Sequence, residues 1–314
     1  MAKRSTKPTS EPQAVATLDI ALRNRHGMQM RVRRWRKGLP GTATPLFLLP
    51  NIDRDLTDLE PLAKAATGAF TQSRDVYALD WRGRGQSEDG AGKLGFGLDC
   101  DGDDFVDAIT GLGLAHAHVI GAGYGGLVAM QLATSRPGFF KSLTMNDTSP
   151  RLDSDGIARA QYWKRRLGKL STWDAATDVL KTNLASRQPG WSDDEWKLLA
   201  RALFKQSDGA HSPLDLSYSK AFRRYYLALG EDEAIETQWQ NFSGLRKIPM
   251  LIIASEHTST LDPDTLMAMR RMRAEAGGFT RTIVAKGQGT VPYLHGKGLM
   301  EALSAFIDEV ERSA

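Results

Sequence analysis

The chain has 314 residues, 41% of them hydrophobic and 25% charged, with a formal net charge of +4. This composition is typical of a soluble globular protein with a sizeable core. No apolar run approaches the ~18 residues that a membrane-spanning helix needs, which argues against such a helix. The single cysteine, Cys100, excludes an internal disulfide and fits a reducing, cytoplasmic compartment.

The N-terminal region combines a polar tail with a predicted hairpin. Residues 1–13 are basic and polar without an apolar core, so we expect a disordered tail rather than a secretory signal. Residues 15–36 alternate as a β-hairpin does, with the turn at residues 24–27. The basic residues of the returning strand are expected on the solvated face of an edge strand: Arg31, Arg33, Arg34, Arg36 and Lys37. No nucleic-acid motif accompanies them, so neither nucleic acid nor a membrane is expected as a partner.

Short apolar runs then alternate with helical patterns, which is typical of a mostly parallel sheet covered on both faces. Strands are expected at residues 45–49, 75–80 and 142–147, with helices from Leu56 and over residues 105–112. Residues 152–245 differ, because they are helical in composition and show no evident strand. They predict an all-helical insertion, with helix starts at Ser171 and Ser192. Beyond Pro249, the pattern predicts strands at 250–254 and 280–285 and helices at 263–276 and 299–312.

A glycine cluster interrupts the strand–helix pattern near residue 120. The apolar pair Val119 and Ile120 leads into the run Gly-Ala-Gly-Tyr-Gly-Gly at residues 121–126. An apolar run rich in small side chains follows it. The pattern predicts a buried strand, a very tight turn and a helix packed close to that strand.

This spacing resembles the nucleophile elbow of the α/β-hydrolase family, Gly-x-Ser-x-Gly, with Gly121 and Gly125 as the flanking glycines. Residues 80–87, Asp-Trp-Arg-Gly-Arg-Gly-Gln-Ser, look like a second family motif, and residues 289–294 look like the loop before the last helix. The resemblance covers residues 15–312 in the right order. It implies an α/β-hydrolase fold with a core at 14–150 and 246–314 and a helical cap at 151–245.

The resemblance also indicates which residues occupy the positions of the catalytic triad. Gly123 falls at the nucleophile, Thr258 at the acid and Thr290 at the base. A serine hydrolase needs a hydroxyl activated by an imidazole that a carboxylate orients. Glycine offers no nucleophile, and threonine does not titrate near neutrality. The sequence therefore predicts a degenerate, non-hydrolytic site.

Other groups remain near the predicted pocket. The family's oxyanion loop corresponds to residues 50–52, so the N–H groups of Ile52 and Tyr124 are expected to point into a ligand pocket beside Asn51. Residues that could replace the triad from nearby are His257, His295 and Asp147. The acidic run at residues 99–104 is interpreted as a solvated helix start, not a calcium loop. It is expected to raise the pKa of Cys100, and no metal or cofactor is expected.

Two hypotheses for function follow. In the first, the pocket between core and cap binds a small, fairly apolar molecule or a partner protein without hydrolysis. In the alternative, an active ester or lactone hydrolase, or a lyase, uses a relocated site that includes a cap residue such as Asp208, His211 or Asp215. A cofactor-free oxygenase is a third hypothesis, which Thr290 argues against. A homodimer stays open.

Overall fold

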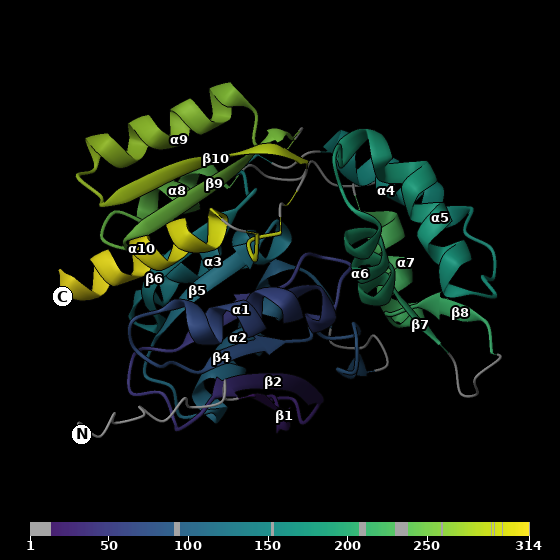
Figure 1. Cartoon of the computed structure of the whole chain (residues 1–314), viewed down its shortest axis with the longest axis horizontal. Helices are drawn as coiled ribbons and strands as arrows, with labels where there is room; N and C mark the ends of the chain where they lie inside the picture. The colour runs from purple at the N-terminus through teal and green to yellow at the C-terminus, as the bar shows by residue number, and fades with distance from the viewer. Residues whose placement is uncertain are drawn as a thin grey trace, which may run out of the picture.

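An eight-stranded sheet in the order β1-β2-β4-β3-β5-β6-β9-β10 forms the centre of the computed structural model (Figure 1). The model describes residues 14–90, 95–151, 154–206, 212–229, 238–258, 260–289, 291, 293–296 and 298–313. The predicted tail at 1–13 and the predicted base position, Thr290, lie outside the described residues.

The predicted hairpin is confirmed, with β1 (Val15–Arg23) antiparallel to β2 (Gln29–Lys37). The prediction that the basic cluster lies on an edge strand is wrong, because β2 also pairs with β4 and β1 is the edge. Acidic side chains on β1 and just before β4 pair with arginines of the cluster, so β2 can lie between two strands. Arg33 pairs with Asp19 and Arg36 with Asp75.

Six parallel strands make up the rest of the sheet. They are β3 (Leu46–Leu49), β4 (Val76–Leu79), β5 (Ala117–Ala122), β6 (Phe140–Asn146), β9 (Met250–His257) and β10 (Thr280–Gly289). The first two in chain order are apolar throughout, and the next three are buried along most of their length. Uniformly apolar strands are typical of a parallel sheet whose two faces are both covered. The mostly parallel α/β architecture expected from the sequence is thus present.

Two apolar clusters cover the two faces of the sheet, and neighbouring strand residues contribute to opposite clusters. Phe47 packs in one and Leu48 in the other. The first face carries α2 (Leu98–Gly111), α3 (Tyr124–Ser135), α8 (Trp239–Gly244) and α9 (Pro263–Glu275). The second carries the short turn η1 (Leu56–Leu59), α1 (Glu60–Ala69) and α10 (Leu299–Arg312). A single-turn helix, η3 (Pro137–Phe139), precedes β6.

The start of α2 differs from the prediction. The apolar stripe of Phe105 and Ile109 faces the core as expected, but the helix begins seven residues earlier, at Leu98. Its first turn contains Asp99 and Asp101, which interact favourably with the positive end of the helix dipole. The prediction relied on the spacing of apolar residues. Because the first turn is mostly polar, that spacing identified only the later, buried part of the helix.

The segment between β6 and α8 lies to one side of the sheet, on the right in Figure 1. It contains α4 (Ser154–Arg165), α5 (Trp173–Leu184), η4 (Ala185–Arg187), α6 (Asp193–Leu203) and α7 (Lys220–Ala228), around an aromatic-rich cluster of its own. The predicted start at Ser192 is confirmed as a capping box with Glu195. The cap of α5 is Thr172, one residue beyond the predicted Ser171.

The prediction that this segment is all-helical is wrong. Strand β7 (Phe204–Gln206) pairs antiparallel with β8 (Leu214–Leu216). Leu214 and Leu216 are buried while Asp215 between them is exposed, which is the alternation of a half-buried strand. A strand of three residues is too short for its two-residue alternation to be recognised within a sequence of helical composition. In the part of the chain that the structure describes, no helix is both long and apolar enough to cross a membrane.

Candidate functional site

The glycine cluster forms a sharp turn between β5 and α3. Gly123 caps α3 with φ +51° and ψ −110°, a conformation that strains any residue with a side chain. A Cβ atom placed on Gly123 would lie 2.8 Å from Oδ1 of Asn51. One placed on Gly125 would lie 2.3 Å from the carbonyl oxygen of Leu49. The predicted strand–turn–helix is present, and its glycines permit close packing of the helix on the sheet.

The Asn51 side chain fills the space beside Gly123. Its Oδ1 accepts hydrogen bonds from the backbone N–H groups of Ile52, at 2.8 Å, and Tyr124, at 3.1 Å. These are the two donors that the sequence predicted for an oxyanion. The structure therefore brings both donors together, and an oxygen of the protein itself lies between them.

A buried carboxylate joins three strand ends nearby. Asp147 directly follows β6, with a φ of +52°, and is fully buried. Its Oδ2 accepts hydrogen bonds from the hydroxyl of Thr258, at 3.0 Å, and the N–H of Val291, at 2.8 Å. The loops that follow β9 and β10 are thereby both held against Asp147. Of the residues predicted at the triad acid and its neighbourhood, Thr258 and Asp147 are in direct contact.

Neither histidine considered as a relocated base lines the cavity described below. The His257 side chain is 50% exposed and lies 3.8 Å from the carboxylate of Glu256. His295 is half-buried with its ring against Tyr293, and burial lowers its pKa below the ordinary value. Asp147, by contrast, is one of the lining residues.

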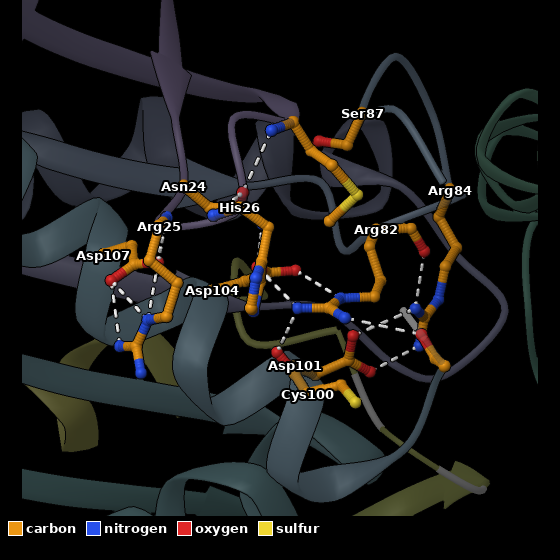
Figure 2. Close-up of polar contacts among 12 residues, drawn as sticks. Asn24, Arg25, His26, Arg82, Arg84, Ser87, Cys100, Asp101, Asp104 and Asp107 are labelled. Atoms are coloured by element: carbon orange, nitrogen blue, oxygen red, sulfur yellow. Dashed lines mark hydrogen bonds and ion pairs between the residues drawn. The ribbon is translucent and has the colours of Figure 1, made fainter. Parts of the chain in front are cut away.

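Two buried ion pairs join the loop after β4 to α2 (Figure 2). Arg84 binds Asp101 at 2.7 Å, and Arg82 binds Asp104 at 2.8 Å, with both aspartates almost fully buried. The interpretation of this acidic run as solvated is therefore wrong for its Asp101 and Asp104. The sequence spacing could not show that two arginines of the loop after β4 would reach them.

This network supports both oxyanion donors. The phenol of Tyr124 donates to Asp101 Oδ2 at 2.7 Å, and Nε of Arg84 donates to the carbonyl oxygen of Ile52 at 3.0 Å. Tyr124 is thus directed toward α2. Burial, with the neighbouring carboxylate second, raises the pKa of its phenol well above the ordinary value. Burial likewise raises the pKa of Cys100. Among the described residues, no group of three or more potential metal-binding side chains gathers.

A cavity of about 200 Å³ opens at the carboxyl ends of the parallel strands. Asn51, Gly123, Tyr124 and Asp147 line its sheet side, and residues of α4 and η4 line the other. The cavity lining is not wholly apolar. Its charged lining residues are Asp53, Arg54, Asp147, Arg151, Lys164 and Arg187.

The most deeply buried cation among them is Lys164 of α4, which is 1% exposed and contacts the carboxylate of Asp53. Burial lowers the pKa of the Lys164 amine, although Asp53 partly offsets this effect. Burial would raise the pKa of Asp53, but Lys164 and Arg54 outweigh it and lower that pKa. The sequence analysis missed this pair because 111 residues separate its members. The position of Asp53 just after a parallel strand was the available signal.

The strand order, the turn at Gly123 and the cavity at the strand ends agree with a comparison against known families. The model of the alpha/beta hydrolase family matches residues 25–302. The chain belongs to the α/β-hydrolase family.

Known proteins resemble this α/β-hydrolase family member over most of its length. A 3-hydroxybutyrate-oligomer hydrolase of Cupriavidus necator is 24% identical over 77% of this chain and 81% of its own. The crystal structure of an alpha/beta hydrolase from Novosphingobium aromaticivorans has a TM-score of 0.80 at 20% identity, covering 93% of this chain and 98% of that one. E-2-(acetamidomethylene)succinate hydrolase has a TM-score of 0.72 at 17% identity, covering 93% and 100%. At these identities the structural likeness extends to the fold alone.

Proposed function

We propose that this protein is a non-hydrolytic member of the α/β-hydrolase family that binds a small molecule in the cavity between the sheet and a helical cap at residues 151–245. The observation that carries the proposal is the side chain of Asn51. Its Oδ1 accepts hydrogen bonds from both N–H groups that would stabilise an oxyanion. The neighbouring Gly123 has no side chain that could attack a substrate.

Acyl transfer by a serine hydrolase requires an attacking hydroxyl, a base and a vacant pair of donors. At the elbow, Gly123 supplies no hydroxyl. The paired donors already have an acceptor. Thr258, at the predicted acid position, donates to Asp147 where an acid would accept from a base. These three features support loss of hydrolysis with retention of the cavity.

The alternative, catalysis by a relocated site, has two candidate groups. Asp147 and Lys164 both line the cavity, and burial shifts the pKa of Lys164 toward neutrality. His257 and His295 do not line it. The relatives are named as hydrolases, which makes this alternative worth a direct test.

Turnover of 4-nitrophenyl acetate and butyrate by the purified protein separates the two functions. We expect no rate above that of buffer, and none in Asp147→Asn or Lys164→Met. A wild-type rate clearly above buffer that disappears in Asp147→Asn would instead establish the relocated site.

Ligand binding in the cavity has a matched test on α4. Ala160 lines the cavity, whereas Ala158 on the same helix is exposed and does not. Small molecules found by ligand-observed NMR are expected to lose binding in Ala160→Phe and to keep it in Ala158→Phe. Equal binding by the two variants would place the ligands elsewhere and contradict the proposal.

A further inference from the structure

The charges that line the cavity are unequal in number. Four side chains are cationic, those of Arg54, Arg151, Lys164 and Arg187, and two are carboxylates, Asp53 and Asp147. A cavity wall with an excess of cations attracts an anionic ligand. Which cations are available depends on the bonds that each one already makes.

Two of the cations are neutralised within the protein. Lys164 contacts Asp53, and Arg54 binds Asp58 at 2.8 Å. The Lys164 amine also lies 3.5 Å from the hydroxyl of Tyr226. Because an ammonium has three donors, this arrangement leaves capacity for a ligand oxygen beside the existing ion pair.

Arg151 is different. It lies in the loop after β6, and its backbone N–H donates to the Ser149 hydroxyl. Within the described ranges, its guanidinium makes no hydrogen bond or ion pair. Its charge reaches Asp262 only at longer range, and that carboxylate is already bonded to the N–H and hydroxyl of Thr265. The guanidinium is therefore a cation on the cavity wall that no described acid neutralises.

The cavity also offers a further donor and an apolar wall. The indole N–H of the lining residue Trp163 is buried and has no acceptor among the described residues. Of the two carboxylates in the lining, Asp53 is paired with Lys164, and Asp147 accepts hydrogen bonds from Thr258 and Val291. The apolar part of the lining comprises Leu127, Ile157, Ala160, Leu184, Leu203 and Val291.

We infer that the ligand of this cavity is a small organic carboxylate, with its carboxylate held by Arg151 and Lys164 and its carbon skeleton against the apolar wall. The inference rests on the proposed small-molecule binding in the same cavity. A guanidinium matches a planar carboxylate with two parallel N–H···O bonds. A phosphate dianion carries twice the charge of the Arg151 guanidinium, so a monocarboxylate is the closer match to that cation.

Calorimetric titration of the full chain at neutral pH tests the charge of the ligand directly. The probes are 3-phenylpropionate, the neutral 3-phenylpropanamide of the same shape, and phenyl phosphate. Loss of one charge-assisted bidentate contact weakens binding by about tenfold or more. We therefore expect 3-phenylpropionate to bind at least about tenfold more tightly than its amide.

The variant Arg151→Gln should remove this preference, weakening the acid by about tenfold and leaving the amide unchanged. Arg166→Gln is the matched control, because Arg166 is an exposed arginine directly after α4 that stacks on Tyr162 and does not line the cavity. It should bind both probes as the wild type does.

Each other outcome overturns the inference in a distinguishable way. Equal binding of the acid and the amide would contradict the preference for a carboxylate, but it would agree with small-molecule binding in the cavity. Tighter binding of phenyl phosphate changes the class of anion. No binding of any probe below about 10 mM, an affinity of under roughly 3 kcal/mol, contradicts both the inference and the binding function. The claim that the protein does not hydrolyse esters is tested separately, because turnover of nitrophenyl esters above the buffer rate would contradict it.

Discussion

At the scale of single residues, Asn51 and Gly123 depend on each other. The Asn51 oxygen occupies the space that a side chain at Gly123 would enter, and it accepts hydrogen bonds from two partly buried backbone donors. Each such donor left unsatisfied costs about 1–3 kcal/mol. Glycine at the turn and asparagine in the preceding loop therefore form one unit, which neither residue type reveals alone.

A double-mutant cycle measures this dependence. Gly123→Ala is expected to lower the free energy of unfolding by about 1–3 kcal/mol, because of the positive φ and the contact with Asn51. In an Asn51→Gly background the loss should shrink by about 0.5–2 kcal/mol. Urea unfolding gives each value. Gly138→Ala is the control, since a Cβ there meets nothing within 4 Å, and strict additivity in the cycle would refute the coupling.

At the scale of elements, the loop after β4 connects the sheet, α2 and the helical segment. Arg84 binds Asp101 of α2, donates to the carbonyl of Ile52, and stacks 4.0 Å from the ring centroid of Phe222 in α7. A backbone hydrogen bond from Gly85 to the carbonyl of Ser217 adds to this connection. The loop thus fixes the floor of the cavity relative to its cover.

Arg84→Met tests how much this connection contributes. It leaves Asp101 buried without its cation, and we expect unfolding free energy to fall by about 3–5 kcal/mol. Arg25→Met is the matched control, because Arg25, in the turn between β1 and β2, also pairs with aspartates of α2 (Figure 2), but its pairs with Asp103 and Asp107 are more exposed to solvent and worth at most about 1 kcal/mol. Equal losses in the two variants, measured by urea unfolding, would disprove a structural role specific to Arg84.

At the scale of the whole molecule, a second polar network lies near the amino ends of the central strands β5 and β6. The cavity opens at the opposite, carboxyl ends of the parallel strands. His118, near the start of β5, contacts the Ser142 hydroxyl at 2.7 Å and the Glu311 carboxylate of α10 at 3.3 Å. Serine, histidine and glutamate thus meet at hydrogen-bond distances, but His118 and Ser142 are buried and line no described cavity. Their role is to join the C-terminal helix to the sheet, together with the ion pair of Arg74 and Glu311.

The hydrogen-bond network of His118 predicts that the folded protein loses stability in acid. Burial lowers the pKa of His118 from 6.5 to about 4, so the folded state binds its proton less readily than the unfolded state does. Stability is therefore full above pH 6.5 and falls as the pH drops from 6.5 to about 4, by roughly 3 kcal/mol in total. Unfolding of His118→Gln at pH 7 and at pH 4.5 should show a smaller loss than the wild type. An identical loss of stability in the variant and the wild type would mean that other titrating groups cause it.

The sequence predicted the sheet well, because most of the parallel strands contain a short apolar run and the glycine cluster at residues 121–126 is a strong signal of a turn. The resemblance to the family's oxyanion loop and elbow singled out the N–H groups of Ile52 and Tyr124, which share one acceptor in the structure. It could not predict that the Asn51 side chain would turn back onto them, because a rotamer is decided by packing. The contact of Lys164 with Asp53 was equally hidden, as only the folded chain brings α4 over the strand ends.

Fluorophosphonate labelling followed by intact-mass spectrometry tests the central claim, that the elbow lacks a working nucleophile. The wild type should gain no adduct. The triple variant Asn51→Gly, Gly123→Ser and Thr290→His frees the two donors, supplies a hydroxyl and adds a base next to Val291, whose N–H binds Asp147. We predict one adduct per chain on that variant, at the introduced hydroxyl. An adduct on the wild-type chain at a rate comparable to that of the variant would contradict the account.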